Sequence, residues 1–180
     1  MFFRKDAFLI FEIYSIKKMK TIYIVRHAKS SWEYEGIDDI DRPLKKRGIK
    51  DSYLIASVLK KNIKRPDVFI TSCATRALTT ATIFSNVFGY PFSNLKINKA
   101  LYSFSDSYLV KTIRALDDEF DSAIIFSHDH GINDFVNKFG SETIPHVPTC
   151  GVIGIKFNNN HWKSIKKGKT ILKEFPKFHK

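Results

Sequence analysis

A short apolar run that ends abruptly in polar residues is the feature that most constrains this fold. Residues 21–25 (TIYIV) are β-branched or aromatic, and Arg26 and His27 follow them directly. A run of this length, bounded by polar residues, is typical of a buried strand. The sequence therefore predicts a strand whose carboxyl end delivers a guanidinium and an imidazole to one edge of a sheet.

Strands and amphipathic helices alternate along the rest of the chain. We predict a polar loop over 30–42, and helices over about 44–61, after 76, over 107–120 and from about 130. Further strands are predicted at 68–70, 123–126 and 151–157, followed by a turn at 158–160 and an edge strand at 161–165. We therefore expect an α/β fold, a three-layer α/β/α sandwich with a mainly parallel sheet and an antiparallel edge strand.

The chain has 180 residues, enough for one sizeable core. We expect one domain over 19–180, preceded by an extension over 1–18. Asp6 and Glu12 interrupt the apolar run of that extension, so it resembles neither a signal peptide nor a membrane span. The two cysteines, Cys73 and Cys150, form no CxxC pair, which favours a reducing, cytoplasmic location over secretion. We expect no membrane partner, because the apolar run near the start is too short and too charged to span a bilayer.

Positive charge dominates the composition. Lys and Arg number 30 against 18 Asp and Glu, a net charge of +12 that favours anionic partners. Residues 161–180 hold seven Lys and one Glu, which fits either a solvated, frayed tail or an anionic docking surface. Trp162, Phe175 and Phe178 also lie there, so a nucleic-acid-binding module is a competing hypothesis, although no RNP, KH or zinc-finger signature is visible.

Three strand ends or helix starts carry a cation or an imidazole: Arg26 with His27, Arg76, and His128. Ligands of open α/β sheets bind at the carboxyl ends of the strands, so these residues can converge on one pocket. Guanidiniums grip phosphate oxygens, and a helix that starts near Arg76 would add backbone donors. A neutral imidazole can attack phosphorus, which makes His27 a candidate nucleophile and His128 a candidate donor to the same oxygens.

Five motifs then carry a family resemblance. Residues 21–31 (TIYIVRHAKSS) resemble the RHG signature of the histidine phosphatase superfamily, with Ala28 where glycine is common. In family order follow 41–48 (DRPLKKRG), 71–77 (TSCATRA, with Cys73 in place of proline), 127–131 (SHDHG) and 149–152 (TCGV). The likeness runs from about Met19 to the C-terminus and is nearest to SixA-like phosphohistidine phosphatases. It implies a phosphoglycerate mutase-like fold.

The resemblance also assigns roles. It implies that His27 is the phosphorylated nucleophile and that Arg26, Arg76 and His128 bind the transferring phosphoryl group. It implies no metal and no cofactor, in keeping with the lack of a Cys/His cluster at zinc spacing.

The proton donor is less well defined. Relatives with an acidic donor carry it after the Arg76 helix, and this chain has no Glu there before Glu119. The candidate acid is therefore Asp39, or its neighbour Asp38, in the loop after the nucleophile. The remaining candidate phosphate ligands are Ser30 and Arg42.

Leaving-group chemistry narrows the substrate class. An imidazole, with a pKa of about 6.5, leaves with far less help from an acid than a sugar or serine alkoxide does. We therefore expect a metal-independent phosphatase that acts on phosphohistidine in a protein through a covalent phosphohistidine intermediate. A small-molecule phosphomonoesterase of the same fold, acting on a small phosphorylated substrate, and a non-catalytic phosphate-binding module are the alternatives.

Overall fold

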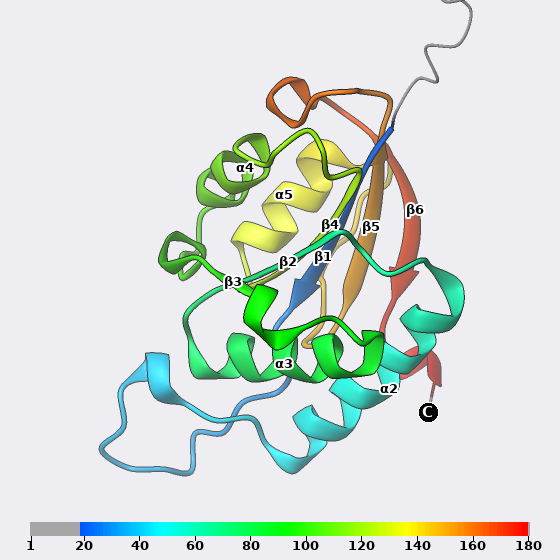
Figure 1. Ribbon diagram of the computed structural model, residues 1–180. Helices are drawn as coiled ribbons and strands as arrows, with labels where there is room; N and C mark the ends of the chain where they lie inside the picture. The colour runs from blue at the N-terminus through cyan, green and yellow to red at the C-terminus, as the bar shows by residue number, and fades with distance from the viewer. Residues whose placement is uncertain (1–18, 180) are drawn as a thin grey trace, which may run out of the picture.

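The computed structural model describes residues 19–179, and the extension expected over 1–18 lies outside the described residues. Six strands form one sheet in the order β3-β2-β4-β1-β5-β6 (Figure 1). Their bounds are β1 Lys20–Arg26, β2 Val68–Thr71, β3 Lys96–Ile97, β4 Ser122–Ser127, β5 Val152–Phe157 and β6 Lys169–Glu174. β3, β2, β4 and β1 pair in parallel, whereas β5 pairs antiparallel with both β1 and β6.

Four helices cover the two faces of this sheet. They are α2 Lys46–Asn62, α3 Thr75–Phe88, α4 Asp106–Arg114 and α5 Gly131–Phe139. Figure 1 shows α2 and α3 on one face and α4 and α5 on the other, and a separate apolar core lies under each pair. The expected three-layer α/β/α sandwich is confirmed. Within residues 19–179, no helix has the length and apolar character needed to cross a membrane.

The register of the parallel strands aligns their carboxyl ends. Arg26, the last residue of β1, lies opposite Ser127, the last residue of β4. Thr71 at the end of β2 lies opposite Phe126. The hydrogen bonding between β1 and β4 continues one residue past the end of β1, because the N–H of His27 donates to the carbonyl of Ser127 at 3.0 Å. Segments that are far apart in the chain therefore deliver their polar residues to one edge of the sheet.

The basic C-terminal segment differs from its prediction. Residues 161–165 are not an edge strand: they contain a 3-10 turn, Trp162–Ser164, and the edge strand is β6. The side chain of Trp162 is fully buried, its indole N–H donates to the carbonyl of Phe120 at 2.8 Å, and its backbone N–H donates to Asp118 at 2.8 Å. These bonds hold 117–120 as a turn, so α4 ends at Arg114 and not at 120 as predicted.

Gly48, the last residue of the 41–48 motif, allows the loop after β1 to pack closely on α2. The first turn of α2 packs directly on the backbone of Lys29, and the N–H of Lys45 donates to the Lys29 carbonyl at 2.8 Å. A Cβ on residue 48 would overlap that carbonyl oxygen, so only glycine allows the approach. Ser30 also forms an isolated antiparallel bridge with Leu44. The loop that follows the nucleophile is thereby fixed against α2.

Candidate active site

A cavity of about 290 Å³ lies at the carboxyl ends of β1 and β4. All seven site residues predicted from the sequence line it, namely Arg26, His27, Ser30, Asp39, Arg42, Arg76 and His128. They come from two strand ends, the loop after β1 and the first turn of α3. Asp38, the second candidate acid, does not line this cavity. The predicted convergence of the three strand ends and helix starts is therefore present in the fold.

His27 presents one defined nitrogen to the cavity. Its Nδ1 lies 2.8 Å from the carbonyl oxygen of Ala28, and because a carbonyl only accepts, Nδ1 carries the proton. The lone pair therefore resides on Nε2, which accepts from Nε of Arg76 at 3.4 Å. Burial, and then the charges of Arg76 and Arg26, lower the pKa of His27 to about 4. At neutral pH the ring is an uncharged base.

His128 packs beside His27, with 5.1 Å between the ring centroids. Its Nε2 lies 2.8 Å from Oγ of Ser72, and its Nδ1 is buried with no hydrogen-bond partner among the described residues. Burial and the neighbouring His27 lower its pKa to about 3. A buried nitrogen without a partner beside a cavity is expected to meet a ligand or water there.

Arg26 is oriented by the 146–147 loop and by Asp129, which itself lines the cavity. Its Nη1 donates to the carbonyl of Val147 at 2.8 Å and lies 3.1 Å from Nε2 of His146, and its Nη2 pairs with Asp129 at 3.0 Å. Its Nε is buried and, within the described chain, has no partner. One N–H of this guanidinium, which belongs to a residue that lines the cavity, is therefore unpaired within the described protein.

Asp39 connects the other two arginines. Its carboxylate pairs with Arg42 at 2.7 Å and with Arg76 at 2.9 Å, and it accepts a hydrogen bond from the Tyr102 hydroxyl at 2.6 Å. Partial burial raises the pKa of Asp39, but the hydrogen bonds from Tyr102, Arg76 and Arg42 outweigh it and lower that pKa to about 2. An ionised carboxylate has no proton to give. In this arrangement Asp39 is an ion-pair partner of both arginines, and its role as the acid stays a prediction.

Ser30 and Arg42 form the side of the cavity near the loop. Nη2 of Arg42 donates to Oγ of Ser30 at 2.6 Å, and its Nε donates to the carbonyl of Ser31 at 2.9 Å. The guanidinium also lies 3.1 Å from the ring centroid of Trp32, whose side chain is exposed. Ser30 and Arg42, both predicted phosphate ligands, thus bond to each other and to neighbouring protein groups.

Several residues of the site were not predicted. Asp129 and Ser72 lie beside predicted residues in the 127–131 and 71–77 motifs, so proximity in the sequence could have identified them. Tyr102 follows a 3-10 turn, Lys99–Leu101, and no local pattern distinguishes it from other exposed aromatics. His130 is exposed at the start of α5, outside the lining of the cavity. Over residues 19–179 no three His, Cys, Asp or Glu side chains are grouped to hold a metal ion.

Comparison with known proteins agrees with this geometry. The sequence profile of the histidine phosphatase superfamily (branch 1) matches residues 22–101, which include the strand end, the loop and the start of α3. Over these residues the chain is similar to the histidine phosphatase superfamily.

Solved structures share the fold over nearly the whole described chain. The protein histidine phosphatase SixA, in a complex with tungstate, has a TM-score of 0.77 at 21% identity, covering 89% of this chain and 99% of SixA. A phosphoglycerate mutase from Bacillus anthracis has a TM-score of 0.61 at 15% sequence identity, and the match covers 89% of this chain and 94% of the mutase. A mycobacterial glucosyl-3-phosphoglycerate phosphatase has a TM-score of 0.62 at 12% sequence identity, and the match covers 86% of this chain and 98% of that phosphatase. The phosphoglycerate mutase-like fold expected from the sequence is confirmed.

Proposed function

We propose that this protein is a metal-independent phosphatase that removes the phosphoryl group from phosphohistidine in a protein. The observation that carries the proposal is the uncharged imidazole of His27, which lines a cavity together with the guanidiniums of Arg26, Arg42 and Arg76. Two buried nitrogens of residues that line this cavity, Nε of Arg26 and Nδ1 of His128, have no partner within the described protein. A tetrahedral anion would satisfy both. The tungstate in the SixA complex is such an anion and supports this interpretation.

The proposed reaction has two displacement steps. Nε2 of His27 attacks phosphorus, the bond between phosphorus and the substrate nitrogen breaks, and the departing imidazole takes up a proton from solvent. Water then attacks the phosphoryl group on His27, the new P–N bond breaks, and inorganic phosphate leaves. Arg26 and Arg76 hold the equatorial oxygens during both steps, and His128 donates to them from Nδ1 in the tautomer that carries a proton there.

The ionised state of Asp39 favours a substrate whose leaving group departs without a strong general acid. The hydrogen bonds from Tyr102, Arg76 and Arg42 lower the pKa of Asp39, a carboxyl that lines the cavity, and favour its ionised form. An alkoxide leaving group depends on a strong general acid, whereas an imidazole, with a pKa of about 6.5, does not. The site therefore suits a phosphoramidate such as phosphohistidine better than an alkyl phosphate.

Turnover with EDTA present tests the proposal. The purified chain is given a histidine-phosphorylated protein, free phosphoramidate and an alkyl phosphomonoester in parallel. We expect kcat/KM to be highest for the phosphohistidine protein and unchanged by EDTA, because arginines supply the positive charge. Loss of turnover on chelation that a divalent ion restores would contradict the metal-independent reaction.

A small-molecule phosphomonoesterase is the second candidate. Its support is the fold shared with the mycobacterial glucosyl-3-phosphoglycerate phosphatase. The same assay separates the two hypotheses, because an alkyl phosphomonoester turned over faster than the phosphohistidine protein would favour the second. Binding of phosphate without turnover of any of the three substrates would instead favour the non-catalytic module.

A further inference from the structure

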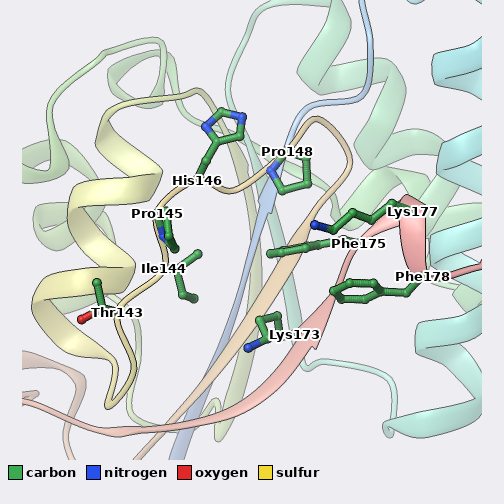
Figure 2. A pocket seen from close by; sticks show the side chains of 9 residues that line it. All are labelled: Thr143, Ile144, Pro145, His146, Pro148, Lys173, Phe175, Lys177 and Phe178. Atoms are coloured by element: carbon green, nitrogen blue, oxygen red, sulfur yellow. The ribbon is translucent and has the colours of Figure 1, made fainter.

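A second pocket, of about 420 Å³, lies next to the candidate active site and takes no part in the proposed chemistry. We call it the basic pocket. Figure 2 shows Ile144 and Pro145 on one side of it and Phe175 and Phe178 on the other. The two phenylalanine rings stack with 5.2 Å between their centroids, and Phe178 is half exposed. A concave apolar surface of this size, within the range of about 300–1,000 Å³ for ligand pockets, can bury an apolar side chain.

The charged groups that line the basic pocket are cationic. Lys173 and Lys177 extend along it, and of residues 19–179 no Asp or Glu lines it. Lys173 pairs with Glu142 at 3.2 Å, an exposed contact that contributes little and is readily exchanged. The ammonium of Lys177 lies 5.5 Å from the ring centroid of Phe178. The pocket therefore combines apolar walls with two ammonium groups that a carboxylate complements.

One loop separates the basic pocket from the phosphoryl site. His146 lines the basic pocket, and its Nε2 lies 3.1 Å from Nη1 of Arg26. The carbonyl of the next residue, Val147, also accepts from Arg26. Pro148 lines the basic pocket and Thr149 lines the catalytic cavity. The basic pocket therefore lies directly beside the phosphoryl site, within reach of a polypeptide bound there.

We propose that the basic pocket docks a segment of the phosphoprotein substrate in which an aromatic or aliphatic side chain stands next to Asp or Glu. The apolar side chain enters between Pro145 and Phe175, and the acidic side chain reaches Lys173 or Lys177. The proposal rests on the proposed function, since it requires a protein substrate. It also favours the docking interpretation of the basic C-terminal segment over the frayed tail, because Lys173 belongs to an ordered strand.

Two series of peptides test this docking. Each peptide is chemically phosphorylated on a single histidine. In one series the sequence Phe-Glu-Glu follows a spacer of roughly two to eight residues, which spans up to about 28 Å, and in the other Ala-Gln-Gln takes its place. At the best spacing we expect KM to be about tenfold lower for the Phe-Glu-Glu peptide, with similar kcat. Rates are normalised to free phosphoramidate, which is too small to reach both sites.

Charge reversal identifies the pocket. In Lys173→Glu/Lys177→Glu the preference for Phe-Glu-Glu is expected to disappear. The control Lys166→Glu/Lys167→Glu changes the net charge equally at exposed positions that line neither pocket, and it is expected to keep the preference. Thermal unfolding confirms that each variant folds. A wild type without the preference at any spacing, or a pocket variant that retains it, would overturn the proposal.

Direct binding separates this proposal from the proposed function. A fluorescein-labelled, unphosphorylated Phe-Glu-Glu peptide is titrated with each protein and followed by anisotropy. We expect binding to the wild type and the control, and at least about tenfold weaker binding to the pocket variant. If no phosphohistidine substrate is turned over, the proposed function fails while this titration still decides on docking. A pocket that binds octanoate but not the peptide would be a site for small amphipathic anions and would contradict protein docking.

Discussion

Nε of Arg76 donates to Nε2 of His27 across 3.4 Å, although the two residues are 49 positions apart in the chain. The bond requires a lone pair on Nε2, which the contact between Nδ1 and the Ala28 carbonyl supplies. A protonated imidazole would bring two cations into contact. The same guanidinium that would grip a phosphoryl group thus favours the uncharged, nucleophilic form of the histidine.

Replacing the nucleophile tests the covalent step. His27→Ala removes the group that accepts the phosphoryl, so turnover of a phosphohistidine substrate is expected to fall to background. Inorganic phosphate should still bind in part, because Arg26 and Arg76 remain. The control His161→Ala removes an exposed imidazole far along the chain and should leave turnover intact. Denatured wild type should carry acid-labile phosphate, and near wild-type turnover by His27→Ala would refute nucleophilic catalysis.

Removing the second histidine should have a smaller effect. His128→Ala deletes a donor to the phosphoryl oxygens but leaves His27, so kcat is expected to fall by about 10²–10³. The phosphorylated intermediate should still form, at a lower rate that rapid quenching can measure. His128→Gln keeps a side-chain donor and should recover part of the loss. Complete loss of the intermediate in His128→Ala would indicate that His128 is the nucleophile.

The charge state of Asp39 can be tested with Asp39→Asn. A general acid contributes typically 10²–10⁴-fold. Because Asp39 is ionised and paired with Arg42 and Arg76, we expect kcat for phosphohistidine to change by less than about tenfold. Binding of tungstate should become tighter, since a competing anion has been removed. A fall in kcat of a hundredfold or more, with tungstate binding unchanged, would restore Asp39 as the proton donor.

The pH dependence follows from the lowered pKa of His27. The ring is a nucleophile only when neutral, so kcat/KM should stay high as the pH falls through 6.5 and decline near its pKa of about 4. An activated aryl phosphate is a suitable substrate, because it survives at that pH. An acid limb near 6.5 would contradict the burial of this ring.

Stability should change over a related pH range. His27 and His128 titrate at about 6.5 when unfolded, and burial lowers their pKa values to about 4 and about 3 in the fold. The unfolded chain therefore binds more protons, so their contribution to stability is complete above pH 6.5 and decreases as the pH falls toward these values. Urea denaturation at each pH separates this loss from the loss of activity.

Gly48→Ala tests the contact that fixes the loop. Alanine normally favours a helix over glycine, but here its Cβ would overlap the carbonyl oxygen of Lys29. We expect a loss of about 1–3 kcal/mol in the free energy of unfolding. Ser57→Ala, at an exposed position of the same helix, should have almost no effect on it. A Gly48→Ala protein as stable as the wild type would show that the loop moves freely away from α2.

Local patterns failed where a distant side chain decided the structure. Residues 107–120 have helical periodicity, yet the helix stops at Arg114, because Asp118 and Phe120 bond to Trp162 from the other end of the chain. The edge strand predicted at 161–165, after the turn at 158–160, was also wrong, because these residues contain a 3-10 turn. Trp162 is buried instead, and residues 169–174 pair with the edge of β5 as the actual edge strand, β6. No local pattern in residues 169–174 distinguishes a strand from a basic tail.

Sequence patterns were sufficient to predict that Arg26, Arg76 and His128 meet at one edge of the sheet, but not that Tyr102 joins them. Arg26, Arg76 and His128 follow short apolar runs or begin a helix, and parallel strands bring such positions to one edge of a sheet whatever else the chain does. The protonation states of Asp39 and His27, in contrast, depend on contacts made in the folded protein. The pKa of Asp39 depends on a guanidinium from α3 and on the Tyr102 hydroxyl, and the pKa of His27 depends on burial beneath other segments. Both effects act through space and fall off over a few ångströms, so no pattern along the chain records them.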